Sequence, residues 1–118
     1  MRKIEPYMTR SDARGKLIGL LNTGTWEEFN YLETKAGQIR GNHYHSETRE
    51  VFFIIEGDIE VVAQYPGQQE TRMIVHAGDI LEVEPEENHT FYCLTNTRWI
   101  NFLSKRFDQN LPDIHFID

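Results

Sequence analysis

Three histidines and one glutamate are the side chains of this sequence best suited to chemistry: His43, His45, His89 and Glu50. Imidazole nitrogen and carboxylate oxygen are ligands that mid-to-late first-row transition metals accept. On a metal that favours six ligands, four protein ligands leave two positions open, which is typical of a catalytic centre. We therefore expect one divalent metal ion, and the ligand chemistry admits Fe(II), Mn(II), Ni(II), Co(II) and Zn(II).

The spacing of these residues suits β-strands. Successive side chains of a strand point to opposite faces, so His43 and His45 share one face. Glu50 can join them once the chain bends through residues 46–49, and His89 would arrive from a separate strand. A lone His-x-His pair is more often a surface feature, so the predicted metal site depends on the full set. Two other histidines are expected to be surface or packing residues: His76 and His115.

Hydrophobic patterning predicts an all-β fold. Short runs rich in Val, Ile, Phe, Tyr and Thr recur between turn signals, and no stretch keeps a helical period. Such strands favour an antiparallel double sheet closed as a jelly-roll barrel around a cavity. The expected strands cover residues 26–34, 37–45, 50–56, 59–65, 71–75, 80–84, 89–94 and 98–103. We also expect an edge strand near 16–20 and a tail, 107–118, whose apolar residues pack on the barrel or on a partner.

The strand that carries Glu50 is apolar on both faces. If Glu50 points into the cavity, Phe52 and Ile54 line the cavity as well, because the faces alternate. The outward positions are then also apolar: Val51, Phe53 and Ile55. A strand of this kind needs cover on both sides, so we predict a homodimer.

Length and charge narrow the remaining possibilities. At 118 residues the chain fits a single domain. Its net charge of −7 would repel a phosphate backbone, so we expect a small-molecule substrate and no nucleic-acid partner. No apolar run reaches membrane length and no secretory signal opens the chain, so we expect a cytoplasmic protein without a membrane partner. The single cysteine, Cys93, should lie in the core.

The spacing of glycines and ligands resembles the two motifs of the cupin superfamily. The first motif spans residues 37–57, and the second spans residues 78–93, with Gly, Asp, Pro and His at the expected positions. Two residues depart from the second motif: Glu86 stands where the family usually has Gly, and Cys93 where Asn is often found. The resemblance implies one cupin domain over residues 1–118, with four metal ligands inside its barrel: His43, His45, Glu50 and His89.

Two segments, residues 12–17 and 39–45, look like pieces of sugar-modifying cupins. These are the nucleotide-linked keto-sugar epimerases and ketoisomerases and the cupin domain of capsular polysaccharide enzymes. The resemblance implies an enzyme that isomerises or epimerises a small polar substrate, such as a keto sugar of surface polysaccharide metabolism. In several of these relatives the histidines act as acid and base without a metal, whereas Glu50 and His89 favour a retained metal here.

An isomerase needs a group that moves a proton while the metal polarises the carbonyl. Coordinated ligands cannot serve as that base, so we consider Tyr31, Tyr92 and Glu33 as catalytic candidates. Arg40 and Asn42 are candidates for binding a substrate oxygen. Two alternatives stay open: an Fe(II)-dependent dioxygenase that uses both open positions, and a non-catalytic module that binds a small molecule.

Overall fold

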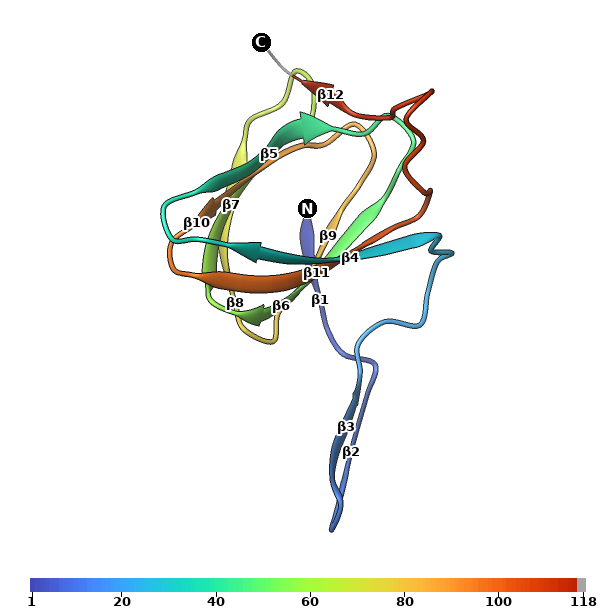
Figure 1. The fold of residues 1–118 in the computed structure, drawn as a ribbon, viewed down its shortest axis with the longest axis vertical. Coiled ribbons are helices and arrows are strands. Elements are labelled where there is room, and N and C mark those ends of the chain that lie inside the picture. The colour runs from blue at the N-terminus through green and yellow to red at the C-terminus, as the bar shows by residue number, and fades with distance from the viewer. Residues whose placement is uncertain (117–118) are drawn as a thin grey trace.

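Two antiparallel sheets enclose a common core (Figure 1). The computed structural model describes residues 1–116, and one sheet has the order β1-β9-β6-β11-β4, the other β12-β5-β10-β7-β8. The strands are β1 (Arg2–Ile4), β2 (Met8–Asp12), β3 (Gly15–Gly19), β4 (Glu28–Thr34), β5 (Ile39–Tyr44), β6 (Glu50–Glu56), β7 (Asp58–Gln64), β8 (Thr71–His76), β9 (Ile80–Val83), β10 (Asn88–Cys93), β11 (Thr97–Leu103) and β12 (His115–Phe116). The predicted all-β jelly roll is confirmed. Within residues 1–116, no helix is long and apolar enough to cross a membrane.

Apolar side chains from both sheets meet in the core. On β6, Phe52 and Ile54 are buried, as the alternation of faces predicts. The ring centroid of Phe52 lies 4.7 Å from that of Phe91 on β10 and 5.5 Å from that of Trp99 on β11. Cys93 belongs to the same cluster, and burial raises the pKa of its thiol, so it is a packing group as expected.

The N-terminal segment differs from the prediction. A strand does form near residues 16–20, but it is β3, and it pairs with β2 in a separate hairpin that projects from the barrel (Figure 1). The chain reverses between Asp12 and Gly15, where the Asp12 carboxylate accepts hydrogen bonds from the backbone and the guanidinium of Arg14. The barrel edge is taken instead by β1, a strand too short to show a hydrophobic period.

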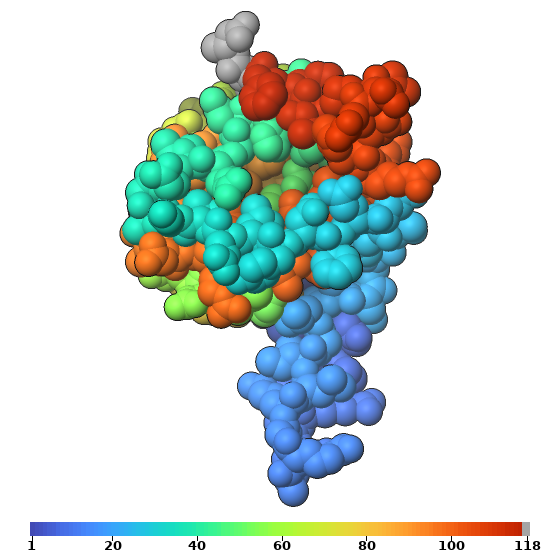
Figure 2. Space-filling model, in the orientation of Figure 1, coloured from blue at the N-terminus to red at the C-terminus, as the bar shows by residue number. Residues whose placement is uncertain are grey.

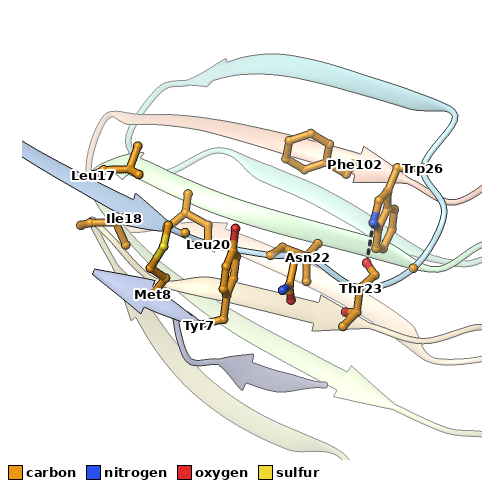
Figure 3. Close-up of a pocket in the computed structure, with 12 residues that line it drawn as sticks. Tyr7, Met8, Leu17, Ile18, Leu20, Asn22, Thr23, Trp26 and Phe102 are labelled. Carbon is orange, nitrogen blue, oxygen red and sulfur yellow. Dashed lines mark hydrogen bonds between the residues drawn. The ribbon is translucent and has the colours of Figure 1, made fainter. Parts of the chain in front are cut away.

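The outer face of the first sheet is covered only in part. Between the hairpin and the barrel runs a largely apolar groove of about 490 Å³, whose walls include Tyr7, Leu17, Trp26 and Phe102 (Figure 3). Val51 on the outer side of β6 is buried, whereas two aromatic side chains of β4, Phe29 and Tyr31, are 70% and 51% exposed. The chain therefore supplies some of the cover expected from a partner, and the homodimer stays a prediction.

A hollow opens between β4 and β5 (Figure 2). Atoms of the green and orange parts of the chain, which include β6 and β10, are visible inside it. The inner faces of the strands are therefore accessible from this side. Arg40 of β5 also ties the two sheets together, because it donates from Nε to Thr34 Oγ1 at 3.2 Å and from Nη2 to the carbonyl of Glu33 at 3.2 Å.

Candidate metal or acid–base site

The four predicted ligands come together on the inner wall of the barrel. One donor atom from each of His43, His45, Glu50 and His89 lies within 4.8 Å of the others. His43 lies on β5, His45 directly follows that strand, Glu50 begins β6 and His89 lies on β10. His43 pairs with His89 across the two strands, with ring centroids 4.7 Å apart. His43 is half-buried and the other three are buried, so the cluster is a recessed site.

The Glu50 carboxylate faces two of the histidines. Its Oε1 lies 2.6 Å from His45 Nε2 and 3.3 Å from His89 Nε2. His89 donates from Nδ1 to the carbonyl of Glu87 at 3.0 Å, which leaves the lone pair of Nε2 directed at the site. Despite the short distances, Glu50 Oε1 and His89 Nε2 are buried without an aligned hydrogen-bond partner among the described residues. Buried polar atoms are rarely left without a hydrogen-bond partner, and both of these atoms are suited to bind a cation.

The environment separates the pKa values of the clustered groups. Burial and the neighbouring His89 lower the pKa of His43 to about 4, so its ring is neutral at pH 7. Burial also disfavours charge on His45, but the facing carboxylate outweighs it and raises the pKa of His45. Burial alone would raise the pKa of Glu50, whereas the two facing imidazoles hold it well below its usual range. Glu50 is therefore ionised at neutral pH.

A β-bulge in β5 shapes this wall. The register between β5 and β10 shifts between His89 and Thr90, opposite Gly41 and Asn42, whose φ angles are 88° and 58°. A Cβ at Gly41 would lie only 2.6 Å from the carbonyl oxygen of His89, so only glycine fits there. Asn42, a predicted substrate-binding residue, takes the exposed left-handed position of the bulge next to the cluster, a conformation that Asn tolerates.

The departure from the second motif at Glu86 keeps the backbone shape of a glycine. Glu86 has a φ of 70°, and its amide donates to the carbonyl of His45 at 2.6 Å. The left-handed conformation costs a residue with a side chain about 1–2 kcal/mol. The loop before His89 is thus attached to a clustered residue in spite of the substitution.

The predicted catalytic residues do not reach the cluster within one chain. Tyr31 lies on the outer side of β4, where its hydroxyl donates to the Glu33 carboxylate at 2.8 Å. Tyr92 alternates with the buried Phe91 on β10 and is exposed on the outer face. Arg40, a predicted substrate-binding residue, pairs with the inward-facing Phe91 across β5 and β10, but its side chain is exposed and bonds Thr34 and Glu33 rather than the cluster.

Sequence reasoning missed Asp113, which supports the site from the C-terminal tail. Its carboxylate accepts five hydrogen bonds of 2.5–3.0 Å, from the backbone amides of Ser46, Glu47 and Thr48 and from the hydroxyls of Ser46 and Thr48. These bonds outweigh burial and hold the pKa of Asp113 well below its usual range. The loop it binds joins two of the clustered residues, so the tail fixes the segment between them.

The tail packs on its own barrel, largely through polar contacts. β12 pairs with β5, and the ring centroid of Phe116 lies 5.9 Å from that of His43. Of the four large apolar residues expected to pack, Ile114 is half-buried, whereas Phe107, Leu111 and Phe116 are exposed. Residues 117 and 118 of the expected tail lie outside the described residues.

The jelly-roll barrel, with three histidines and a glutamate clustered on its inner wall, has the cupin fold. A family model described as polysaccharide biosynthesis C-terminal domain matches residues 10–115, and this chain belongs to that family. No curated protein matches the chain.

Several solved structures share the fold. The capsular polysaccharide assembling protein CapF from Staphylococcus aureus is 21% identical, with a TM-score of 0.74 over 94% of this chain and 34% of CapF. A 3,4-ketoisomerase from Helicobacter canadensis is 20% identical, with a TM-score of 0.76 over 95% of this chain and 87% of the ketoisomerase. The RmlC epimerase from Mycobacterium tuberculosis is 16% identical, with a TM-score of 0.79 over 98% of this chain and 67% of RmlC. This chain therefore spans about a third of CapF.

Proposed function

We propose that this domain is a divalent-metal-binding cupin that isomerises or epimerises a keto sugar of surface polysaccharide metabolism. The observation that carries the proposal is the buried cluster, in which Glu50 Oε1 and His89 Nε2 lack aligned partners. Membership of a polysaccharide biosynthesis family and a fold shared with sugar ketoisomerases and epimerases support a sugar as the substrate.

The clustered side chains fit a metal ion in charge as well as in position. His43 is neutral at pH 7, and Glu50 is ionised and offsets part of the charge of a cation. With His45 and His89, these residues would hold one Fe, Mn, Ni, Co or Zn ion. The ion, when bound, supplies Lewis-acid polarisation of the substrate carbonyl.

The remaining inner wall would orient the substrate and exclude water. Phe91 packs behind His89 with ring centroids 5.6 Å apart, and Phe52 lies beside it, so the base of the site is apolar. Arg40 offers a guanidinium to a substrate oxygen at the hollow between β4 and β5. Tyr31 and Tyr92 face outward, so they would contribute only to a site across a subunit interface.

A metal-independent acid–base reaction is the second candidate, and the 2.6 Å contact between His45 Nε2 and Glu50 Oε1 favours it. The raised pKa of His45 suits a general acid that protonates the carbonyl oxygen. The lowered pKa of His43, whose ring centroid is 5.2 Å from that of His45, leaves a neutral ring able to accept the proton from carbon.

One experiment separates these candidates. Protein purified without chelator is analysed for metals, and deuterium exchange from solvent into a nucleotide-linked keto sugar is followed without oxygen, before and after metal removal. Bound metal and exchange lost on chelation support the metal-dependent isomerase. Undiminished exchange in metal-free protein supports the acid–base reaction instead. No exchange overturns both: substrate-dependent oxygen uptake would then indicate the dioxygenase, and silence in both assays the binding module.

A further inference from the structure

A row of polar side chains crosses the largely apolar inner wall of the first sheet. It begins at Glu50 of β6 and continues to Asn101 of β11, whose Nδ2 lies 3.2 Å from Glu50 Oε2. Asn30 of β4 follows, with its Nδ2 3.1 Å from Asn101 Oδ1 and 2.9 Å from Glu28 Oε2. The row thus connects the clustered carboxylate with the edge strand at the hollow between β4 and β5.

The direction of these hydrogen bonds is fixed by chemistry. A carboxylate only accepts hydrogen bonds, so Glu50 and Glu28 must each face an amide NH₂ group. Asn101 therefore points its NH₂ group at Glu50 and its oxygen at Asn30, whose NH₂ group has one hydrogen for Asn101 and one for Glu28. Neither amide can flip without facing acceptor to acceptor.

Asn101 occupies a position where packing alone would favour an apolar residue. The inward-facing neighbours on its strand, Trp99 and Leu103, are both buried and apolar. Asn101 itself is half-buried, so leaving its amide unpaired would be costly. Its bond to Glu50 uses Oε2 alone, and Oε1 is left facing His45 and His89.

We propose that Asn101 is a positioning residue for the metal site: it holds Oε2 of Glu50 so that Oε1 alone points at His45 and His89. This inference rests on the proposed metal-binding function. An anchored carboxylate keeps one oxygen in a fixed direction, whereas a free one rotates and loses orientation when the ion leaves. Partners of this kind typically change metal affinity by about 10- to 100-fold when removed.

The test is a double-mutant cycle on metal affinity, measured for Zn(II) by competition with a chelator. Asn101→Leu keeps the approximate size but removes the donor, and we expect about 10- to 100-fold weaker binding. In a Glu50→Ala background, where the three histidines still bind Zn(II), the same change should alter affinity no more than about twofold, because its target is absent. Asn30→Leu is the matched control, since it leaves the bond between Asn101 and Glu50 in place, and should have the smaller effect.

Two further measurements separate positioning from folding. The Co(II) protein should change its visible absorption spectrum in Asn101→Leu and keep it in Asn30→Leu, and urea unfolding of the metal-free variants should give similar stabilities. Equal loss of affinity in both backgrounds, or in both asparagine variants, overturns the inference. Normal affinity in Asn101→Leu would overturn the inference about Asn101 but leave the proposed metal site unaffected. Wild-type protein that binds no metal would overturn both proposals.

Discussion

Asp113 accepts two hydrogen bonds from Thr48, one from the backbone amide at 3.0 Å and one from the hydroxyl at 2.8 Å. The two residues are far apart in the chain, and their contact connects the tail to the loop between His45 and Glu50. The loop amides around Thr48 have the same carboxylate as their acceptor. The geometry of the site thus depends on a residue outside both cupin motifs.

Replacing Asp113 with Asn should destabilise the domain and weaken metal binding. A neutral amide oxygen is a poorer acceptor than a carboxylate, and we expect a loss of about 1–3 kcal/mol in the free energy of unfolding. Urea denaturation measures this loss. Asp108→Asn is the control, because Asp108 is an exposed tail residue that accepts a bond from the nearby Asn110 amide. Equal stability of the two variants would contradict the role given to Asp113.

The stabilisation by Asp113 should depend on pH in a defined direction. The pKa of Asp113 is lowered in the folded state, so the carboxylate stabilises the fold fully above its unfolded pKa of about 3.9 and loses this effect as the pH falls. The difference in unfolding free energy between wild type and Asp113→Asn should be constant from pH 7 to pH 5 and shrink below about pH 4. Glu50 is present in both proteins and cancels in this difference.

Glu50→Gln should weaken metal binding while keeping the fold. The amide removes the negative charge, so we expect affinity for Zn(II) to fall by more than about tenfold, whereas the core of apolar side chains is untouched. Equilibrium dialysis measures the affinity and circular dichroism the fold. Glu33→Gln changes a glutamate on the outer face of β4 and should bind metal normally. Wild-type metal content in Glu50→Gln would show that the ligand assignment is wrong.

Gly41→Ala should disturb the site more than a matched change at Gly37. Both glycines have positive φ angles, 88° and 85°, so alanine costs about 1–2 kcal/mol at either position. Only at Gly41 would the added Cβ also meet the carbonyl of His89, whereas at Gly37 nothing lies within 4 Å. The free energy of unfolding in urea and the affinity for Zn(II) should therefore both be lower in Gly41→Ala than in Gly37→Ala. Equal values in the two variants would argue against the close approach of Gly41 to His89.

The exposed aromatic residues of β4 should lie in a dimer interface. Phe29 stacks on Phe102 with ring centroids 5.7 Å apart and is otherwise open to solvent, next to a hairpin that packs against little of its own barrel. We expect sedimentation equilibrium to show a dimer at micromolar concentration and Phe29→Glu to shift it toward monomer. Ile74→Glu, at an exposed position on the other sheet, should leave the dimer intact. A monomeric wild-type protein would rule out this arrangement.

The strands and the clustered residues could be predicted because they depend on local periodicity. Each of the eight predicted barrel strands was found within two residues of its expected ends. His43, His45, Glu50 and His89 follow from strand alternation together with the spacing of the motifs. The same alternation, applied to Tyr92, would have placed it outward, because its neighbour Phe91 faces the core.

Other features depend on pairings that no short-range pattern encodes. Asn101 faces Glu50 only because β6 lies next to β11, and the facing of Tyr31 depends on the register between β4 and β11. Asp113 lies in an irregular tail whose apolar residues suggested hydrophobic packing, whereas the contact that holds it is polar. The contacts of these residues join segments that are distant in the sequence, so no pattern within one segment predicts them.

The bulge at Gly41 and Asn42 changes which residues one strand can present. Arg40 and His43 are three positions apart, so a regular strand would turn them to opposite faces. The extra residue shifts the phase of the alternation, and Arg40 pairs with Phe91 while His43 pairs with His89, both toward the interior. One strand thereby ties the two sheets together at one end and presents histidines at the other. Deletion of Asn42 would restore the regular alternation of the strand, so the residues now at positions 40 and 43 could no longer both keep their present roles.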